Sequence, residues 1–324
     1  MRMTAHRIDE GIYHPKDLED REISRAAPSP PGRIVSLTPI ASELICIFGC
    51  IDRIVGRDDH STFPPALGEK PAVGSGVYRT ISAKRVLDLD PDIVVTGRRV
   101  PQEEFEKIGS AGIPVVVIGT GCELEALITN ILTLGKRMAA EKKAGELVDF
   151  LERYANLIRD RTGDLNIEGK PRVYNECAFR RYITKTCTTA DEVISIAGGT
   201  NIAPDEDLGR LEVSGEWVIR SNPDVILSQV SSTSPATEET LLAKRDEVLE
   251  RPELKGTNAV RNGRVYISHL SIRRGPRMVG YLLYLAKWFH PELFQDIDPA
   301  AVEKDMLQKF YGLNLEGAWA YPEV

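Results

Sequence analysis

The chain alternates short runs of β-branched residues with longer segments in which apolar residues recur at helical spacing. The first strand-like run is Arg33–Leu37, and an apolar helical segment from Ile40 to Phe48 follows it. Further strand-like runs in this half are Arg53–Gly56, Asp92–Val95 and Pro114–Ile118. Strands without internal polar alternation, separated by helices, are typical of a parallel sheet covered on both faces. The pattern predicts an α/β domain.

A long helical segment follows this domain. Apolar residues keep helical spacing from Glu123 to Arg161, with a break near residues 135–140, and the part from Glu141 to Arg161 contains no proline. At about 1.5 Å per residue this part is about 30 Å long. The sequence therefore predicts a stiff connecting helix.

The second half repeats the pattern of the first, with strands expected at 172–174, 224–227 and 264–267. Residues 82–95 read SAKRVLDLDPDIVV and residues 214–227 read SGEWVIRSNPDVIL, which is the same helix, Pro-Asp turn and buried strand at identical spacing. Pro and Asp are ordinary turn residues, so the repeat indicates duplicated topology rather than chemistry. The predicted organisation is a polar, Pro-rich arm (1–32), an amino lobe (33–140), a linker helix (141–162), a carboxy lobe (163–312) and a tail (313–324).

Composition narrows the class of protein. The 324 residues include 41 Lys+Arg and 48 Asp+Glu, which gives a net charge of −7, and no apolar run of about 20 residues occurs. This argues against a membrane span and against nucleic acid as the main partner. The start, MRMTAHRIDE, lacks the apolar core of a secretion signal, so we expect a leader only in a longer precursor. The five cysteines form no CxxC pair, and a bridge between Cys177 and Cys187 stays open.

Several segments together resemble a known family. They are RIVSLTPIASELICIFGCIDRIVG, the two repeated segments, AGGTNIA, NGRVYIS and GPRMVGYLLYLAKWFHPELF, in this order and spacing from about Arg33 to about Gly312. The chain resembles the substrate-binding proteins of ABC importers for iron-siderophore complexes, haem and cobalamin. The resemblance implies two α/β lobes joined by one rigid long helix, a ligand in the cleft between them and no resident cofactor. It also implies a place in the periplasm or at the outer face of the cell membrane, with the cytoplasm left open by the missing leader.

The loops that follow the expected strands carry the candidate ligand-binding residues. In open α/β sheets ligands bind beyond the carboxyl ends of the strands. All three Arg-Arg doublets of this acidic chain lie at such ends, and guanidinium groups bind anions by charge-assisted hydrogen bonds. For any single arginine, solvation or pairing with a nearby acid is the alternative. The candidates are Tyr78, Arg79, Arg98, Arg99, Arg180, Arg181, Tyr182, Lys185, His269, Arg273 and Arg274.

These residues predict an Arg-lined cleft for an anionic ligand. Together with the resemblance, which implies a metal chelate as the solute, we expect a monomeric binding protein for a small anionic metal chelate, without enzymatic activity. No GxSxG, HExxH or phosphate-binding glycine loop occurs, and the five histidines do not pair at ligand spacing. We interpret Asp58-Asp59-His60 as a solvated loop rather than a metal site. The alternatives are a cytoplasmic chelatase-like or nitrogenase-like tetrapyrrole or metal enzyme, and a cytosolic ligand sensor; a chelatase would need His and carboxylates in its cleft.

The resemblance also implies a docking acid on each lobe, which pairs with Arg of the permease. Glu216 of SGEWVI matches in the carboxy lobe, whereas the equivalent place in SAKRVL holds Lys84. We therefore expect asymmetric docking to a membrane permease. Docking through Asp88, a permease with a complementary acid, and no docking at all remain the alternatives.

Overall fold

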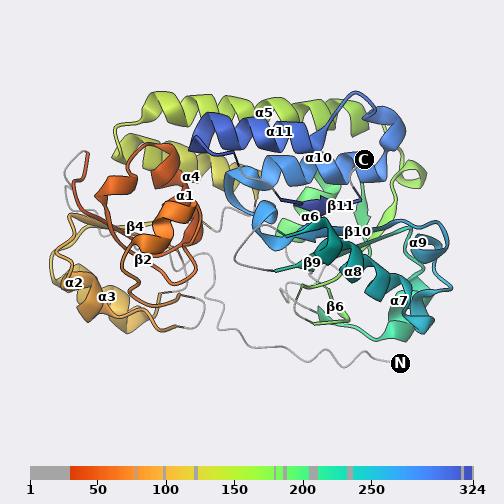
Figure 1. The fold of residues 1–324 in the computed structure, drawn as a ribbon, viewed down its shortest axis with the longest axis horizontal. Helices are drawn as coiled ribbons and strands as arrows, with labels where there is room; N and C mark the ends of the chain where they lie inside the picture. The colour runs from red at the N-terminus through yellow and green to blue at the C-terminus, as the bar shows by residue number, and fades with distance from the viewer. Residues whose placement is uncertain are drawn as a thin grey trace. The chain divides into compact units, whose positions relative to one another are not determined.

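The computed structural model describes residues 30–76, 79–97, 100–119, 123–178, 180–184, 188–203, 211–231, 236–314 and 317–322 (Figure 1). Internal contacts divide the chain into two compact units, and the division falls between Phe150 and Leu151. We call the described residues up to 150 the amino unit and those from 151 the carboxy unit.

The amino unit contains a four-stranded sheet in the order β2-β1-β3-β4, in which all neighbouring strands are parallel. This confirms the α/β class predicted from the branched runs. Its strands are β1 (Ile34–Ser36), β2 (Ile54–Arg57), β3 (Ile93–Thr96) and β4 (Val115–Val117). Its helices are α1 (Pro39–Ile47), α2 (Ala83–Leu87), α3 (Gln102–Ser110) and α4 (Leu124–Arg137).

Both faces of this sheet are covered by apolar side chains. Val35 and Val94 pack with Val86 of α2 and Ile108 of α3 in one buried cluster, and α1 contacts α4 and β1. A strand with helices on both faces has no solvated side, which is why these strands read as continuous apolar runs.

Helix α5 (Glu141–Thr162) is one uninterrupted element of 22 residues, about 33 Å long. It begins directly after the break that the sequence predicts, where Ala139 adopts a left-handed backbone (φ 53°). Gly135 of α4 faces Ala144 of α5 so closely that a Cβ at position 135 would collide with it. This close approach explains a glycine inside α4.

The carboxy unit contains a five-stranded sheet in the order β11-β10-β9-β5-β7. Four strands are parallel, and β11 pairs antiparallel with β10 at the edge. Strand β11 belongs to the expected C-terminal tail, and the sequence pattern did not predict it. The strands are β5 (Arg172–Asn175), β7 (Thr200–Asn201), β9 (Val225–Val230), β10 (Val265–His269) and β11 (Ala320–Tyr321), and a separate antiparallel pair is formed by β6 (Ile183–Thr184) and β8 (Leu211–Glu212).

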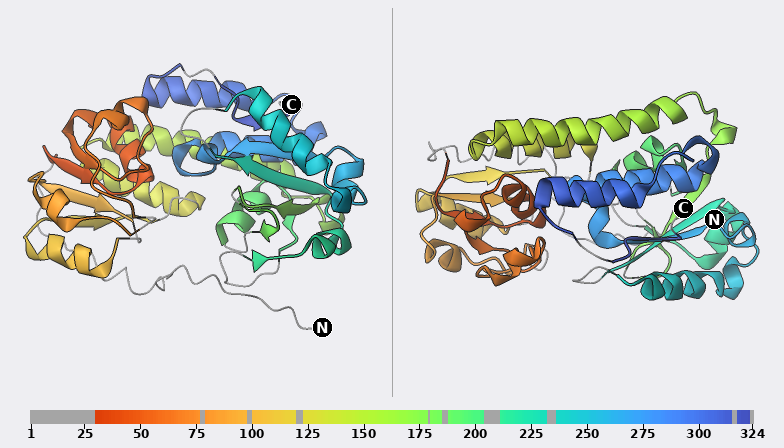
Figure 2. Two further views of the ribbon diagram at one scale, coloured as in Figure 1. Left: turned by 60° about the horizontal axis from the view of Figure 1, so that its bottom comes forward. Right: turned by 45° about the horizontal axis from the view of Figure 1, so that its top comes forward.

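Helices cover both faces of this sheet as well. Tyr174, Ile226 and Ile267 pack with α7, α8 and α9 on one face, whereas Tyr266 stacks on Trp288 of α10 on the other, with ring centroids 4.7 Å apart. Helices α10 and α11 pack against each other (Figures 1 and 2). The helices are α6 (Thr188–Ile196), α7 (Gly215–Ser221), α8 (Glu238–Leu249), α9 (Asn258–Arg261), α10 (Met278–Phe289) and α11 (Pro299–Met306).

The repeated sequence motif forms equivalent structures in the two units. The side chain of Ser82 caps α2 and that of Ser214 caps α7. The aspartate of each Pro-Asp turn accepts a hydrogen bond from the backbone at the start of a neighbouring strand: Asp92 from the Arg33 N–H (2.9 Å) and Asp224 from the Arg172 N–H (3.0 Å). The motif therefore aligns two parallel strands in each unit, a tertiary role beyond the turn expected from sequence.

Candidate functional site

The strand ends of the amino unit include a buried polar chain. The Asp58 carboxylate, 2% exposed, accepts hydrogen bonds from the Ser61 hydroxyl and the His60 N–H (3.1 Å). Ser61 is linked to Ser42 (2.9 Å), which also bonds Ser36 at the end of β1 (2.8 Å). Burial raises the pKa of Asp58, and these bonds oppose the rise. The solvated-loop interpretation was wrong for Asp58, although the two residues after it are exposed.

The candidate ligand residues of this unit lie largely outside the described residues: Tyr78, Arg98 and Arg99 are not among them, and neither is Lys185 of the carboxy unit. Arg79 is exposed and has a left-handed backbone (φ 57°). The turn that carries it is tight, because a Cβ on Gly74 would collide with the Thr80 backbone. The turn therefore presents Arg79 to solvent.

In the carboxy unit, the chain turns back between β5 and β6, and we call the described residues 176–178 and 180–184 the β5 loop. The Cys177 N–H donates to the Ile183 carbonyl (2.7 Å), and the Val213 N–H donates to the Tyr182 carbonyl (2.8 Å). Tyr182 has a left-handed backbone (φ 58°). These bonds fix a narrow turn.

The two arginines of the β5 loop are exposed and paired with acids. Arg180 lies 4.0 Å from Glu212 and keeps 62% of its side chain exposed. Arg181 lies 2.5 Å from Glu247 with 58% exposed. Exposed ion pairs contribute about 0–1 kcal/mol, so these pairs hold the arginines only weakly. Pairing with acids is the alternative that the sequence left open, and both arginines remain accessible to an anion.

Tyr182 is more firmly engaged. Its hydroxyl donates to the Glu253 carboxylate, and its ring lies 5.7 Å from the Arg251 guanidinium. Burial and the neighbouring carboxylate raise the pKa of Tyr182 to about 12. In the structure this hydroxyl is therefore bound within the protein.

A buried ion pair holds the first residue of the β5 loop, Glu176, and no sequence pattern predicts it. Arg251, 3% exposed, donates to both carboxylate oxygens of Glu176, 1% exposed, at 2.8 and 2.9 Å. It also donates to Glu247 at 3.1 Å. Glu176 in turn accepts from the Tyr182 N–H at 3.2 Å. Glu176 and Arg251 lie 75 positions apart, and no local pattern connects an acid and a base at that distance.

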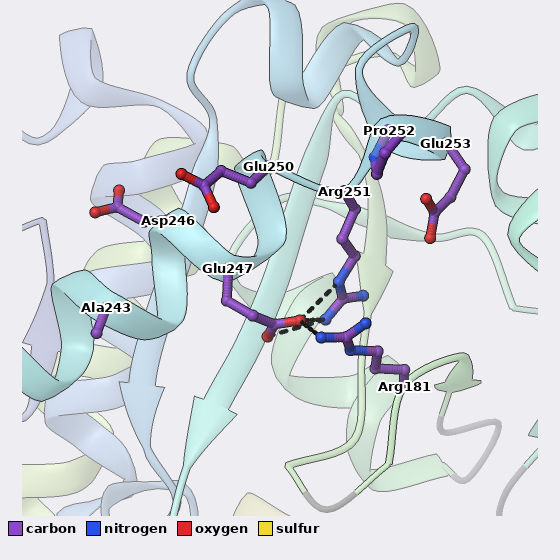
Figure 3. A pocket seen from close by; sticks show the side chains of 8 residues that line it. All are labelled: Arg181, Ala243, Asp246, Glu247, Glu250, Arg251, Pro252 and Glu253. Atoms are coloured by element: carbon purple, nitrogen blue, oxygen red, sulfur yellow. Dashed lines mark hydrogen bonds and ion pairs between the residues drawn. The ribbon is translucent and has the colours of Figure 1, made fainter.

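Arg181 and Arg251 both point to the Glu247 carboxylate (Figure 3). The pocket around them is open and has a volume of about 520 Å³. Burial by itself would raise the pKa of Glu247, but hydrogen bonds from Arg251 and Lys244 outweigh it and lower the pKa to about 2. Glu247 is therefore ionised at any physiological pH. The pocket is lined by Arg181, Ala243, Asp246, Glu247, Glu250, Arg251, Pro252 and Glu253.

The third arginine doublet, after β10, is divided by the fold. Arg273 is buried (8% exposed) whereas Arg274 is exposed. His269, at the end of β10, is also buried; its Nδ1 lies 2.6 Å from the Ser271 hydroxyl and its ring packs on Trp319. The two members of this doublet therefore have different surroundings, and the role of either in ligand binding stays a prediction. No metal-ligating group of three or more His, Cys, Asp or Glu occurs among the described residues.

The two candidate docking residues occupy equivalent positions. Lys84 and Glu216 are each the second residue after the capping serine of α2 and α7. Lys84 is 82% exposed and pairs with Asp88 at 2.7 Å, and Glu216 is exposed. The equivalence supports the register on which the expected charge difference depends.

Comparison with known proteins agrees with this architecture, because the periplasmic binding protein family matches residues 34–269. The chain belongs to this family. The ABC transporter substrate-binding lipoprotein YvrC of Bacillus subtilis is 26% identical over 273 residues, which cover 82% of each chain. The cobalamin-binding protein of Halobacterium salinarum is 26% identical over 272 residues, which cover 81% of this chain and 70% of that protein.

Among solved structures, a periplasmic haem-binding protein from Pseudomonas aeruginosa superposes with a TM-score of 0.65 at 26% identity, over 81% of this chain and 94% of that one. The resemblance found in the sequence is thereby confirmed: this is a substrate-binding protein of the ABC-importer type. Family members act as binding proteins of transporters rather than as enzymes. None of the helices in the described ranges is long and apolar enough to cross a membrane.

Proposed function

We propose that this periplasmic binding protein captures a small anionic metal chelate outside the cytoplasm and delivers it to a membrane permease. The family match over residues 34–269 carries the proposal. Relatives named for cobalamin and haem support a metal complex as the solute, and the lipoprotein and periplasmic relatives support the location.

The arginines at the strand ends support an anionic solute. Arg79 is exposed on the turn before α2 of the amino unit. Arg180 and Arg181 are exposed on the β5 loop of the carboxy unit. Charge-assisted hydrogen bonds to carboxylate or phosphate contribute about 1.5–3 kcal/mol each, more than the exposed pairs that Arg180 and Arg181 now form. An anionic solute can therefore displace Glu212 and Glu247 from these arginines.

The ligand class is tested on the purified protein. We expect an absorption band in the visible range or bound iron or cobalt in protein prepared without added ligand. Calorimetric titration with haemin, cyanocobalamin and ferric citrate then identifies the class. Absence of binding to all three, together with metal-free protein, would contradict the metal-chelate proposal.

Docking is tested with the cognate permease in liposomes. Glu216→Lys places a base where the family pairs an acid with Arg, and like charges at a pairing site oppose association. We expect Glu216→Lys to abolish ligand-stimulated ATPase activity, and Lys84→Glu not to increase it. Full activity of Glu216→Lys would remove the docking role from Glu216. Sedimentation of the protein alone should show a monomer.

A further inference from the structure

The segment between β10 and α10 buries two arginines within five residues. Arg273 ends the 3-10 helix η6 (Leu270–Arg273) and Arg277 ends the 3-10 helix η7 (Gly275–Arg277). They are 8% and 3% exposed, whereas Arg274 between them is exposed. Fully buried arginines are rare unless they are paired.

Arg273 lacks the partners that such burial normally requires. Its Nε and Nη1 atoms are buried and have no hydrogen-bond acceptor among the described residues. Its guanidinium lies 5.3 Å from the Tyr281 ring, one turn into α10. The Tyr281 hydroxyl lies near Arg273 and Ser268, but no hydrogen bond of normal geometry satisfies it. A buried guanidinium with unmet donors is destabilising, and its charge has to be compensated from elsewhere.

A buried acid of this region, Glu303, interacts electrostatically with Arg277 rather than with Arg273. Glu303 of α11 is 1% exposed, and its Oε2 lies 3.2 Å from the place where a Cβ on Gly280 would be. The positive charge of Arg277 interacts electrostatically with the Glu303 carboxyl and favours its ionised form. Neither carboxylate oxygen of Glu303 forms a hydrogen bond within the described part of the chain. Burial raises the pKa of Glu303 to about 8, so the carboxyl is largely protonated at neutral pH. Glu303 therefore does not supply an anion for Arg273.

The surroundings of Arg273 favour an anion from outside the protein. Helix α10 begins at Met278, five residues after Arg273, and the N-terminus of a twelve-residue helix carries partial positive charge. Arg273 also lies at the carboxyl end of β10, the side on which parallel sheets bind ligands. Arg273 is nine-tenths buried, so an oxyanion bound there would be shielded from water on most sides.

We infer that Arg273 is the binding residue for an oxyanion group, carboxylate or phosphate, of the solute. That the bound oxyanion belongs to the transported solute rests on the proposed function. The anion site itself is inferred from the Arg273 donors that have no acceptor among the described residues. The planar guanidinium offers two parallel N–H donors on each of two edges, Nε with Nη2 on one and Nη1 with Nη2 on the other, and either pair matches the two oxygens of a carboxylate or phosphate. Binding at either edge would satisfy one of the donors that the folded protein alone leaves without acceptors.

The test uses sodium citrate and sodium phosphate as probes, with sodium chloride at equal ionic strength as the reference. Arg273→Met removes the charge and keeps an apolar stem, and Arg261→Met, at an exposed arginine of α9, is the matched control. In thermal unfolding we expect citrate or phosphate to raise the Tm of the wild type and of Arg261→Met by about 2–4 °C over chloride, and not that of Arg273→Met. Which probe acts tells a carboxylate site from a phosphate site.

Affinity for the active probe, measured by calorimetry, should fall about tenfold to a hundredfold in Arg273→Met. If Arg273→Met fails to fold, Arg273→Lys keeps the charge without the fork, and about a tenfold loss is expected. The inference is overturned if neither probe exceeds chloride in the wild type, or if the Arg273 variants bind as the wild type does.

The same variants separate this inference from the proposed function. If citrate or phosphate binds in a way that depends on Arg273, but haemin, cyanocobalamin and ferric citrate do not bind, the anion site is supported and the metal-chelate proposal is contradicted. Chelate binding that is unchanged in Arg273→Met would support the proposed function and remove Arg273 from its site.

Discussion

Two buried arginines of the carboxy unit have opposite surroundings. Arg251 is 3% exposed, and its donors meet both oxygens of Glu176 and the carboxylate of Glu247. Arg273 is 8% exposed, and its buried Nε and Nη1 have no acceptor among the described residues. Similar burial is thus accompanied by full pairing in one place and by unmet donors in the other.

The difference separates a structural role from a binding role. A buried pair that is held by several hydrogen bonds keeps its neighbours in one arrangement, and Glu176 also accepts a hydrogen bond from the Tyr182 N–H of the β5 loop. A buried charge without a partner costs stability, and such costs are concentrated at functional sites. We therefore regard Arg251 as a positioning residue for the β5 loop and Arg273 as a binding residue.

The largest effect is expected on breaking the paired site. Arg251→Met leaves Glu176 buried without a counter-charge, and we expect a loss of about 3–5 kcal/mol in the free energy of unfolding. Urea denaturation measures it. The double variant Arg251→Met with Glu176→Gln should recover a large part of the loss, since no uncompensated charge remains. A cost below about 1 kcal/mol for Arg251→Met would contradict the structural role.

Beside the unpaired site, Glu303 makes stability depend on pH. The folded protein holds the Glu303 proton up to about pH 8, whereas the unfolded chain releases it near the ordinary value of 4.5. The unfolded state therefore ionises first, and the contribution of Glu303 to stability falls as pH rises from about 4.5 to about 8. We expect a decline of roughly 2–4 kcal/mol over this range.

Glu303→Gln is the matched variant for this pH dependence, because glutamine does not ionise. Its unfolding free energy should lack the decline and exceed that of the wild type above pH 8. Parallel pH profiles of the two proteins would show that Glu303 is not held in its protonated form.

Removal of the unpaired charge should have the opposite sign to removal of the paired one. Without ligand, we expect Arg273→Met to leave stability unchanged or to raise it by about 1 kcal/mol, because a buried charge without acceptors is replaced by an apolar side chain. Arg274→Met should change it by less than about 0.5 kcal/mol. A loss of several kcal/mol in Arg273→Met would place Arg273 with Arg251 as a structural residue.

The smallest effect on stability is expected at the exposed arginines of the β5 loop. Replacing Arg180 and Arg181 together by alanine removes two exposed ion pairs, so the Tm should hardly change. Affinity for the chelate identified by titration should fall strongly, and the same is expected for Arg98 with Arg99. Unchanged affinity in both double variants would remove these loops from the binding site.

The sequence by itself determined the fold class and the place of several of the longer regular elements. Branched apolar runs predicted strands β1, β3 and β9, and helical spacing predicted α5 and the break before it, because both signals depend on neighbours along the chain. The duplicated motif was also visible, since the two units repeat the same local order of helix, turn and strand. Short β11 was missed because two residues that pair only with β10 leave no periodic pattern.

The tertiary structure alone decided what each charged residue does. In the sequence, Arg273 and Arg274 are one doublet like Arg180 and Arg181, yet one member is buried against Tyr281 and the other is exposed. Glu176 and Arg251 form a buried ion pair although they lie 75 positions apart in the sequence. Burial and pairing depend on which distant segments the fold brings together, and electrostatic energies depend on both, so local sequence patterns do not determine them.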